Sequence, residues 1–214
     1  MKKLLTTSLV LLIFFSANQV RGEAGSSFGV LTTAESVGMG HGMFSGFVAL
    51  VDNTSFGGSF TYGLSRFTDA RFKLAMVDNV KGSTELAFGA DFKYQFMVMD
   101  SISNSPFDMA VGGLFEYMNR EFGSVFQIGG QLIASFPTKL SSGSLLIPYG
   151  RINFRSEKVS IDAVGTEPSS SNSNLEIGLN GGVKWEVTKN VSLFGEFQFD
   201  GNDGLVFGID FNSF

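Results

Sequence analysis

Residues 84–96 read TELAFGADFKYQF, and apolar side chains alternate with charged, polar or small ones along this stretch. Such alternation places the two sets on opposite faces of an extended strand. A strand of a soluble sheet usually ends after roughly 5 to 6 residues, whereas a strand that crosses a bilayer at a tilt needs about 9 to 11. Length and pattern together therefore predict a membrane-spanning strand. One face carries Leu86, Phe88, Ala90, Phe92, Tyr94 and Phe96, and the other carries Glu85, Asp91, Lys93 and Gln95.

The same pattern recurs along the chain and predicts an all-β protein, an antiparallel up-and-down transmembrane β-barrel of about ten strands. Eight and twelve strands are the alternatives, because two links expected on the inner side, 97–106 and 134–144, are long. The longest link, 156–174, falls on the outer side and contains the Ser-rich stretch 169–173, which is typical of a solvated loop. The expected strands are 42–51, 55–64, 69–77, 84–96, 107–118, 122–133, 145–154, 175–185, 191–199 and 205–211.

The N-terminus has the layout of a secretory signal peptide. A short positive region is followed by an apolar run at 4–15 and by a polar region with small residues at 16–23. We therefore expect a signal peptide at 1–22, an N-terminal periplasmic segment at 23–41 and an outer-membrane barrel at 42–214. The expected location is the outer membrane of a bacterium with a Gram-negative type of envelope.

The charge and composition of the chain exclude several classes of protein. Removal of the signal peptide takes away Lys2, Lys3 and Arg21 and no acid, so the formal net charge falls by three, from -5 to -8. An acidic chain without a basic cluster is a poor candidate for binding nucleic acid. The chain has no cysteine, so disulfides and Cys-based metal sites are excluded.

Alternation leaves open which face points inward. A soluble lipocalin-like carrier would turn the apolar face inward around a small ligand. Against this, each strand carries several large apolar side chains, more than a narrow lumen holds. The polar face is rich in Gly and Ala and mixes acids with bases, as expected where buried charges must pair. The predicted lumen charge network consists of Arg71, Lys73, Glu85, Asp91, Lys93, Asp108, Glu116, Arg151, Glu176, Lys184, Glu196 and Asp210.

Several features of the chain are shared with a known class of membrane protein. They are the segments SPFDMAVGG (105–113) and VKWEVTKNVSLFGEFQFD (183–200), the ten Phe-rich strands and the terminal Phe214. In these features the chain resembles small bacterial outer-membrane β-barrel proteins of the OmpA-like or OmpW-like, porin-type kind. The resemblance implies that Phe214 is an insertion signal. The partners it implies are outer-membrane lipid and the barrel-insertion machinery, and an extracellular or periplasmic protein partner is left unidentified.

The sequence predicts no catalytic residue, no cofactor site and no metal site. His41 is the only histidine and precedes the first strand, so we read it as solvated or structural. The glycines of Gly38-x-Gly40-x-Gly42 lack the strand, helix and Lys-Ser or Lys-Thr of a phosphate loop. The stretch DGNDG (200–204) lacks the spacing of a calcium loop and is read as a hairpin turn.

Three functions remain open at this point. A non-enzymatic structural or interaction barrel with a lumen filled by charged pairs fits the mixed charges best. A small channel or transporter for small or apolar solutes is the first alternative. Phe194, a ring on a polar face, would either line its route or simply fill space. The soluble lipocalin-like carrier is the second alternative.

Overall fold

The computed structural model describes residues 28–29, 31–78, 83–99, 105–163 and 168–212. Every regular element among them is a strand, and no helix of this part of the chain is long and apolar enough to cross a membrane. The strands are β1 (Gly42–Val51), β2 (Ser55–Ser65), β3 (Thr68–Asp78), β4 (Thr84–Met97), β5 (Asp108–Arg120), β6 (Gly123–Ser135), β7 (Thr138–Lys139), β8 (Leu145–Ile161), β9 (Ser170–Glu186), β10 (Val191–Phe199) and β11 (Gly204–Asn212).

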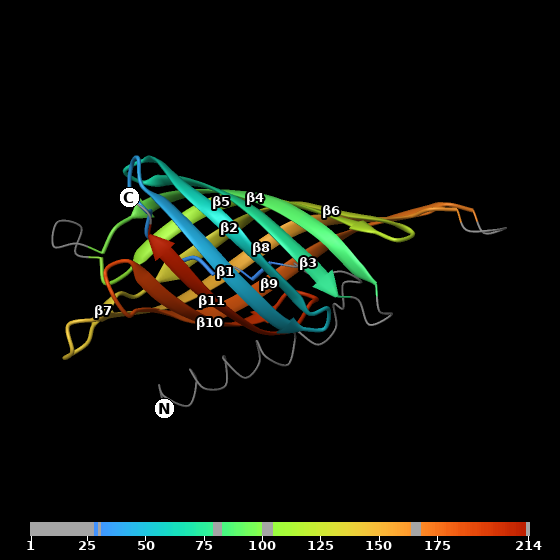
Figure 1. Ribbon diagram of the computed structural model, residues 1–214. Helices are drawn as coiled ribbons and strands as arrows, with labels where there is room; N and C mark the ends of the chain where they lie inside the picture. The colour runs from blue at the N-terminus through green and yellow to red at the C-terminus, as the bar shows by residue number, and fades with distance from the viewer. Residues whose placement is uncertain (1–27, 30, 79–82, 100–104, 164–167, 213–214) are drawn as a thin grey trace, which may run out of the picture.

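The strands form one closed antiparallel barrel (Figure 1). Sequential neighbours pair with one another, β6 pairs with β8, and β1 pairs with β11 to close the sheet. The two-residue strand β7 pairs only with the start of β8, as a small hairpin outside the wall. Ten strands therefore make the wall, which confirms the predicted fold class and strand number. We call the end where β1 begins and β11 ends the proximal end, and the opposite end the distal end.

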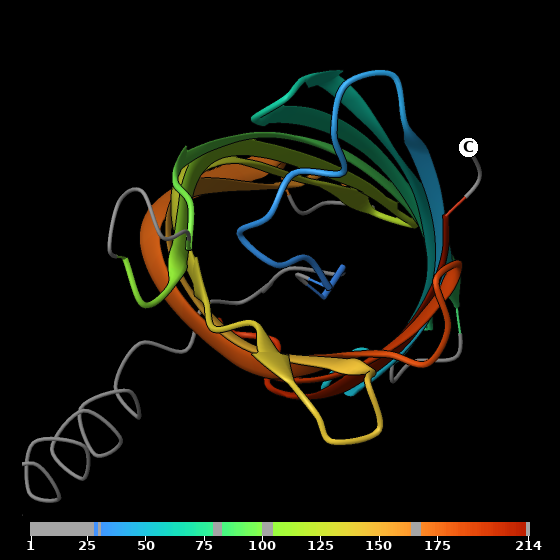
Figure 2. The same ribbon diagram turned by 90° about the vertical axis from the view of Figure 1, so that its left-hand side faces the viewer.

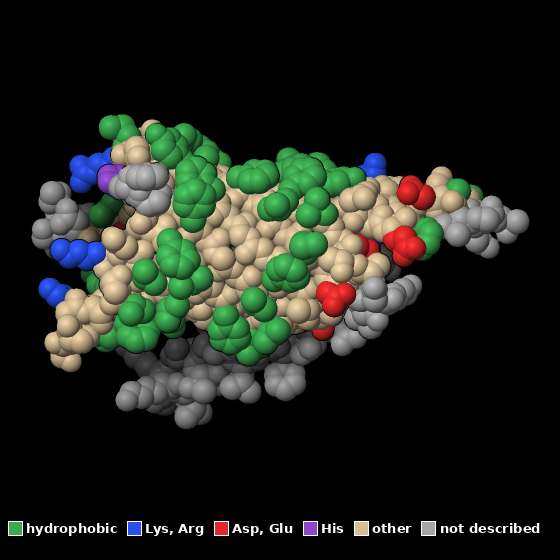
Figure 3. Space-filling model, in the orientation of Figure 1, with side chains coloured by type: hydrophobic (Ala, Val, Ile, Leu, Met, Phe, Trp, Pro, Cys, Tyr) green, Lys and Arg blue, Asp and Glu red, His purple; other side chains and the backbone are tan. Residues whose placement is uncertain are grey.

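The apolar faces of the strands point outward. On β3, Phe72 is 56% exposed whereas the next residue, Lys73, is 4% exposed. Rings on adjacent strands meet on the outer surface, as where Phe88 lies 5.2 Å from Tyr117 between ring centroids. Figure 3 shows hydrophobic side chains spread over the outer wall and charged ones gathered at its two ends. This is the reverse of a soluble lipocalin-like carrier, which would have its apolar side chains inside.

The hairpin of β8 and β9 is longer than the sequence predicts. The two strands stay in register as far as the pair Ile161 and Ser170, so the expected loop at 156–174 is a link at 162–169. The side chains of residues 170–173 are exposed, as predicted for the Ser-rich stretch, but their backbone belongs to β9. Ladder hydrogen bonds between the two strands extend the pairing beyond Phe154, where the outward side chains of β8 at 156, 158 and 160 are no longer apolar. Figure 1 shows this hairpin projecting from the distal end.

Candidate functional site

The centre of the lumen holds a buried cluster of four charged side chains from three adjacent strands. Arg71 of β3 pairs with Asp91 of β4. Lys73 Nζ lies 3.0 Å from Asp91 Oδ1 and 2.8 Å from Glu116 Oε1 on β5. Gly89 leaves room for this contact, because a Cβ there would lie 2.9 Å from Lys73 Cε. Each buried charge thus faces an opposite one, which offsets the cost of removing it from water.

A second polar group lines the wall formed by β8, β9 and β10. Tyr149 donates a hydrogen bond of 2.6 Å from its hydroxyl to Glu196 Oε2, and Asn180 Nδ2 donates one of 3.3 Å to Glu196 Oε1. The ring of Tyr149 packs edge-on against Phe194 at 6.1 Å between centroids. Phe194 is the ring that the sequence places on a polar face, and the structure adds Tyr149 and Phe47 as buried lumen rings.

A third polar group lies toward the distal end. Arg155 Nη1 lies 3.5 Å from Asp200 Oδ2, and Gln198 Nε2 donates a hydrogen bond of 2.8 Å to Asp200 Oδ1. Asp200 belongs to the turn between β10 and β11, which is held by its own hydrogen bonds to Asp203. Burial raises the pKa of the Asp200 carboxyl to about 6, against the opposing influence of Arg155 and Arg151. The stretch DGNDG therefore forms the expected hairpin turn.

The chain before β1 lies inside the barrel. We expect a periplasmic segment at 23–41 from the sequence. The structure places residues 28–29 and 31–37 of it, which we call the lumen segment, between the walls (Figure 2). Phe28 is 1% exposed and packs against Phe47. Leu31 is 5% exposed and fills the space left by Gly208, where a Cβ would lie 2.8 Å from Leu31 Cδ1. Apolar burial inside a polar lumen thus favours this position for the segment.

Side chains from several walls bind the backbone of the lumen segment. Lys93 Nζ donates hydrogen bonds of 2.8 Å to the Thr33 carbonyl and 2.6 Å to the Glu35 carbonyl, and it pairs with Asp69 at 3.2 Å. The Leu31 amide donates to Glu196 Oε2 at 2.9 Å, and the Ala34 amide donates to Ser135 Oγ at 3.1 Å. Because β4, β6 and β10 all contribute partners, the segment crosses the lumen.

A turn at Gly38 and Gly40 leads from the lumen segment into β1. Both glycines have positive φ angles, 87° and 78°, which favour glycine over other residues. The Gly40 amide donates a 2.9 Å hydrogen bond to the Gly63 carbonyl. The glycine triplet that superficially resembles a phosphate loop is therefore a chain reversal at the barrel mouth. His41 is exposed in this turn, with Nδ1 3.2 Å from the Met39 carbonyl.

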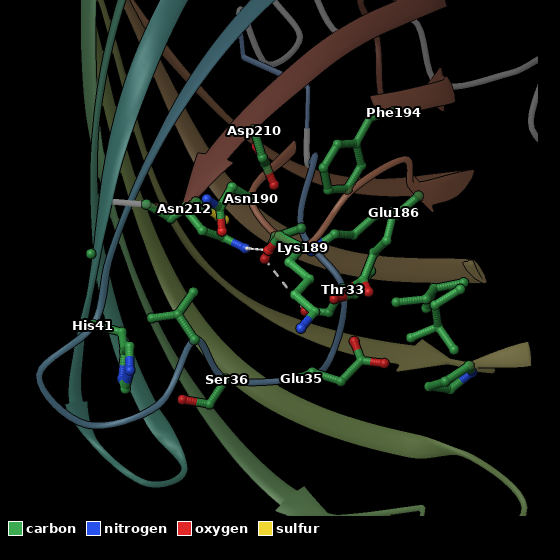
Figure 4. A pocket seen from close by; sticks show the side chains of 18 of the residues that line it. Thr33, Glu35, Ser36, His41, Glu186, Lys189, Asn190, Phe194, Asp210 and Asn212 are labelled. Atoms are coloured by element: carbon green, nitrogen blue, oxygen red, sulfur yellow. Dashed lines mark hydrogen bonds between the residues drawn. The ribbon is translucent and has the colours of Figure 1, made fainter. Parts of the chain in front are cut away.

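A cavity of about 680 Å³, which we call the vestibule, lies at the proximal end (Figure 4). The lumen segment borders it through Thr33, Glu35 and Ser36, and the barrel wall contributes Lys184, Phe194 and Asp210. Lys184 Nζ lies 5.6 Å from the ring centroid of Phe194. Both carboxylate oxygens of Asp210 and one of Glu35 are buried without a hydrogen-bond donor among the described residues.

The structure brings some of the predicted network residues together and separates others. Arg71, Lys73, Asp91 and Glu116 form the central cluster described above. Glu85 lies 3.8 Å from Arg120, and Asp108 accepts a 2.9 Å hydrogen bond from Gln95. All twelve residues face the lumen side of their strands, and all are buried except Lys184, which is half-buried. The remaining members are Lys93 at the lumen segment, Glu196 beside Tyr149, Lys184 and Asp210 in the vestibule, and Arg151 and Glu176 in the wall of β8 and β9. Phe214 lies outside the described residues.

Several residues that complete these contacts could not be identified from the alternation of the strands. Arg155 lies beyond the expected end of its strand at 154, although it continues the same alternation. Asp69 was the first residue of an expected strand, and Asp200 was read only as part of a turn. Their partners, Lys93 and Arg155, come from other strands, so single-strand alternation carries no signal for the pairing.

Several solved structures are similar to this chain, among them the following three. The N-terminal β-barrel domain of Pseudomonas aeruginosa OprF is 13% identical, with 82% of this chain and 99% of that one covered at a TM-score of 0.40. The siderophore receptor PirA from Pseudomonas aeruginosa is 10% identical. The match covers 78% of this chain and 40% of the receptor, with a TM-score of 0.23. A triple mutant of the Rhodopseudomonas blastica porin is 10% identical. The match covers 81% of this chain and 99% of the porin, with a TM-score of 0.21. At these TM-scores the likenesses carry no argument about function.

No family model matches the sequence, and no curated protein matches it. The resemblance to OmpA-like or OmpW-like proteins therefore stays a prediction, whereas the closed barrel is observed.

Proposed function

We propose that the chain is a non-enzymatic outer-membrane β-barrel protein. The outward apolar faces support this location, since exposed rings such as Phe72, Phe92 and Phe207 would meet lipid instead of water. Charged side chains lie inside the wall or at its two ends, as a bilayer requires. Lipid and the insertion machinery are the partners that this location calls for.

We further propose a structural or interaction role with a closed lumen. The observation that carries this proposal is the course of the lumen segment, which is bound by Lys93 on β4, Ser135 on β6 and Glu196 on β10. The segment and the central ion-pair cluster both lie inside the lumen, and their contacts with several walls support a closed passage. A barrel of this kind presents its loops and its outer surface to partners, while its lumen serves stability.

Single-channel conductance in planar bilayers tests the closed lumen. We expect no stable conductance from the full mature protein. A variant in which residues 28–37 are replaced by Gly and Ser at equal length should conduct, because it keeps the chain length but loses the contacts of Phe28 and Leu31. The faster gel migration of unboiled barrel in detergent shows that both proteins are folded. Stable conductance in the mature protein would refute the closed lumen.

A channel for small solutes is the second candidate, and the vestibule favours it. This cavity of about 680 Å³ extends into the barrel from the proximal end, and its inner boundary is the lumen segment, which is not part of the wall. Conductance of the mature protein that small solutes block would support this function over the structural one.

A further inference from the structure

Asp210 is a buried carboxylate that has hydrogen-bonding capacity to spare. It is 1% exposed, and neither oxygen accepts a hydrogen bond of normal geometry among the described residues. The charged groups around it are Lys184 on β9, Arg71 on β3 and Lys93 on β4, and the side chain of Ser45 on β1 offers it a weak hydrogen bond. A buried carboxylate with so few donors is costly, so a ligand that supplies donors would be bound favourably there.

The side chain of Asp210 points into the vestibule beside an aromatic ring. Asp210 is paired with Ser192 on β10, and Phe194 is two residues further on the same face, which places the two side chains diagonally, roughly 7 to 8 Å apart. Figure 4 shows both side chains directed into the cavity. Lys184, the partner of Phe194 on β9, already places its ammonium 5.6 Å from this ring. An acid, a ring and a base thus follow one another on three adjacent strands.

We propose that Asp210 and Phe194 form a binding site for small solutes that carry a primary ammonium group. Such a group has three N–H donors for the two carboxylate oxygens, and the ring face attracts a cation through its quadrupole. The solute is either a simple amine or a zwitterion of the amino-acid type. In a zwitterion, the carboxylate is positioned to pair with Lys184. The vestibule has ample room for a solute of this size.

The test measures binding of three matched four-carbon probes to the full mature protein in lipid nanodiscs. n-Butylamine is the cation, 4-aminobutyrate the zwitterion and butyrate the anion, and NMR titration of the ligand signals gives each Kd. We expect the two ammonium probes to bind and butyrate not to bind. Tighter binding of 4-aminobutyrate than of n-butylamine identifies a zwitterion site that uses Lys184, and the reverse order identifies an amine site.

Variants show whether the site is the one described. Asp210→Asn should weaken ammonium binding tenfold or more, as the loss of a charge-assisted hydrogen bond does. Phe194→Leu keeps the carboxylate and should weaken binding several-fold. Glu186→Gln is the matched control, since Glu186 also lines the vestibule but is not part of the acid and ring pair, and it should change the Kd less than twofold. Equal binding of butyrate, or ammonium binding that neither Asp210→Asn nor Phe194→Leu weakens, would overturn the proposal. Conductance plays no part in these measurements, so their outcome is independent of the closed lumen.

Discussion

Replacing Lys93 by Met should release the lumen segment and destabilise the barrel. Lys93 is 6% exposed, and its ammonium holds the Glu35 carbonyl, the Thr33 carbonyl and the Asp69 carboxylate. Methionine keeps the volume of the side chain but leaves Asp69, which is 2% exposed, as an uncompensated charge. Removing one partner of a buried ion pair costs about 3 to 5 kcal/mol. We expect the free energy of unfolding to fall by about that amount.

Two assays follow this change separately. Urea unfolding of the refolded barrel is monitored by the fluorescence of Trp185, the only tryptophan, whose side chain lies on the outer surface. Docking of the lumen segment is monitored by thiol labelling of Thr33→Cys, which would be the only cysteine of the chain. Thr33 is 5% exposed, so its labelling should be slow in the parent and faster by about a hundredfold or more when Lys93 is lost, since each 1.4 kcal/mol is about tenfold.

A double variant identifies the mechanism. Asp69→Asn combined with Lys93→Met removes the stranded charge, so its destabilisation should be smaller than the sum of the two single changes. Lys139→Met is the control, because Lys139 is exposed in the β7 hairpin and should have little effect. If Lys93→Met changes neither the unfolding free energy by more than about 1 kcal/mol nor the labelling rate, the reasoning on Lys93 is wrong.

Three further changes probe the wall, the turn and the distal group. Phe207→Arg places a charge on the outer face near the middle of β11 and should lower the free energy of unfolding in lipid by about 2 to 4 kcal/mol. Phe207→Leu should lower it far less. Equal urea midpoints for the two variants would contradict a lipid-facing position. Gly63→Ala should disturb the turn before β1, because a Cβ at this position collides with the Gly38 carbonyl. Gly195→Ala is its control, since a Cβ there has open space around it. The labelling rate of Thr33→Cys should rise with Gly63→Ala and stay unchanged with Gly195→Ala. For Asp200, burial penalises the charged form in the folded state, so this penalty applies above pH about 6 and disappears below about 3.8. Stability should therefore gain from this group as pH falls through that range, and Asp200→Asn should flatten the dependence in urea unfolding at several pH values; an unchanged slope would count against this assignment.

Much of the wall was predictable from the chain alone because it follows from local geometry. Side chains in a strand alternate between two faces, so Phe72 and Lys73 had to point in opposite directions wherever β3 lies. The central cluster was predictable for the same reason. Its members, Arg71, Lys73, Asp91 and Glu116, all occupy polar-face positions of neighbouring strands. The exception was the end of a strand, as at β8, where the outward side chains are no longer apolar after Phe154 but backbone pairing continues to Ile161.

The position of the lumen segment inside the barrel could not be predicted from strand alternation. Residues 31–37 have no alternation, and their partners Lys93, Ser135 and Glu196 are distant in the sequence. Small residues such as Gly208 signal a crowded lumen, but they do not reveal that Leu31 fills the space.

The period of two in this sequence establishes that the chain forms long strands with one apolar and one polar face, and the large rings on the apolar face indicate that this face points outward. Which acid meets which base, where the chain before β1 lies and that Asp210 is left beside Phe194 in an open vestibule all depend on closure of the barrel. The physical reason is that alternation is a property of each strand, whereas register, closure and lumen filling arise from interactions between segments far apart in the chain.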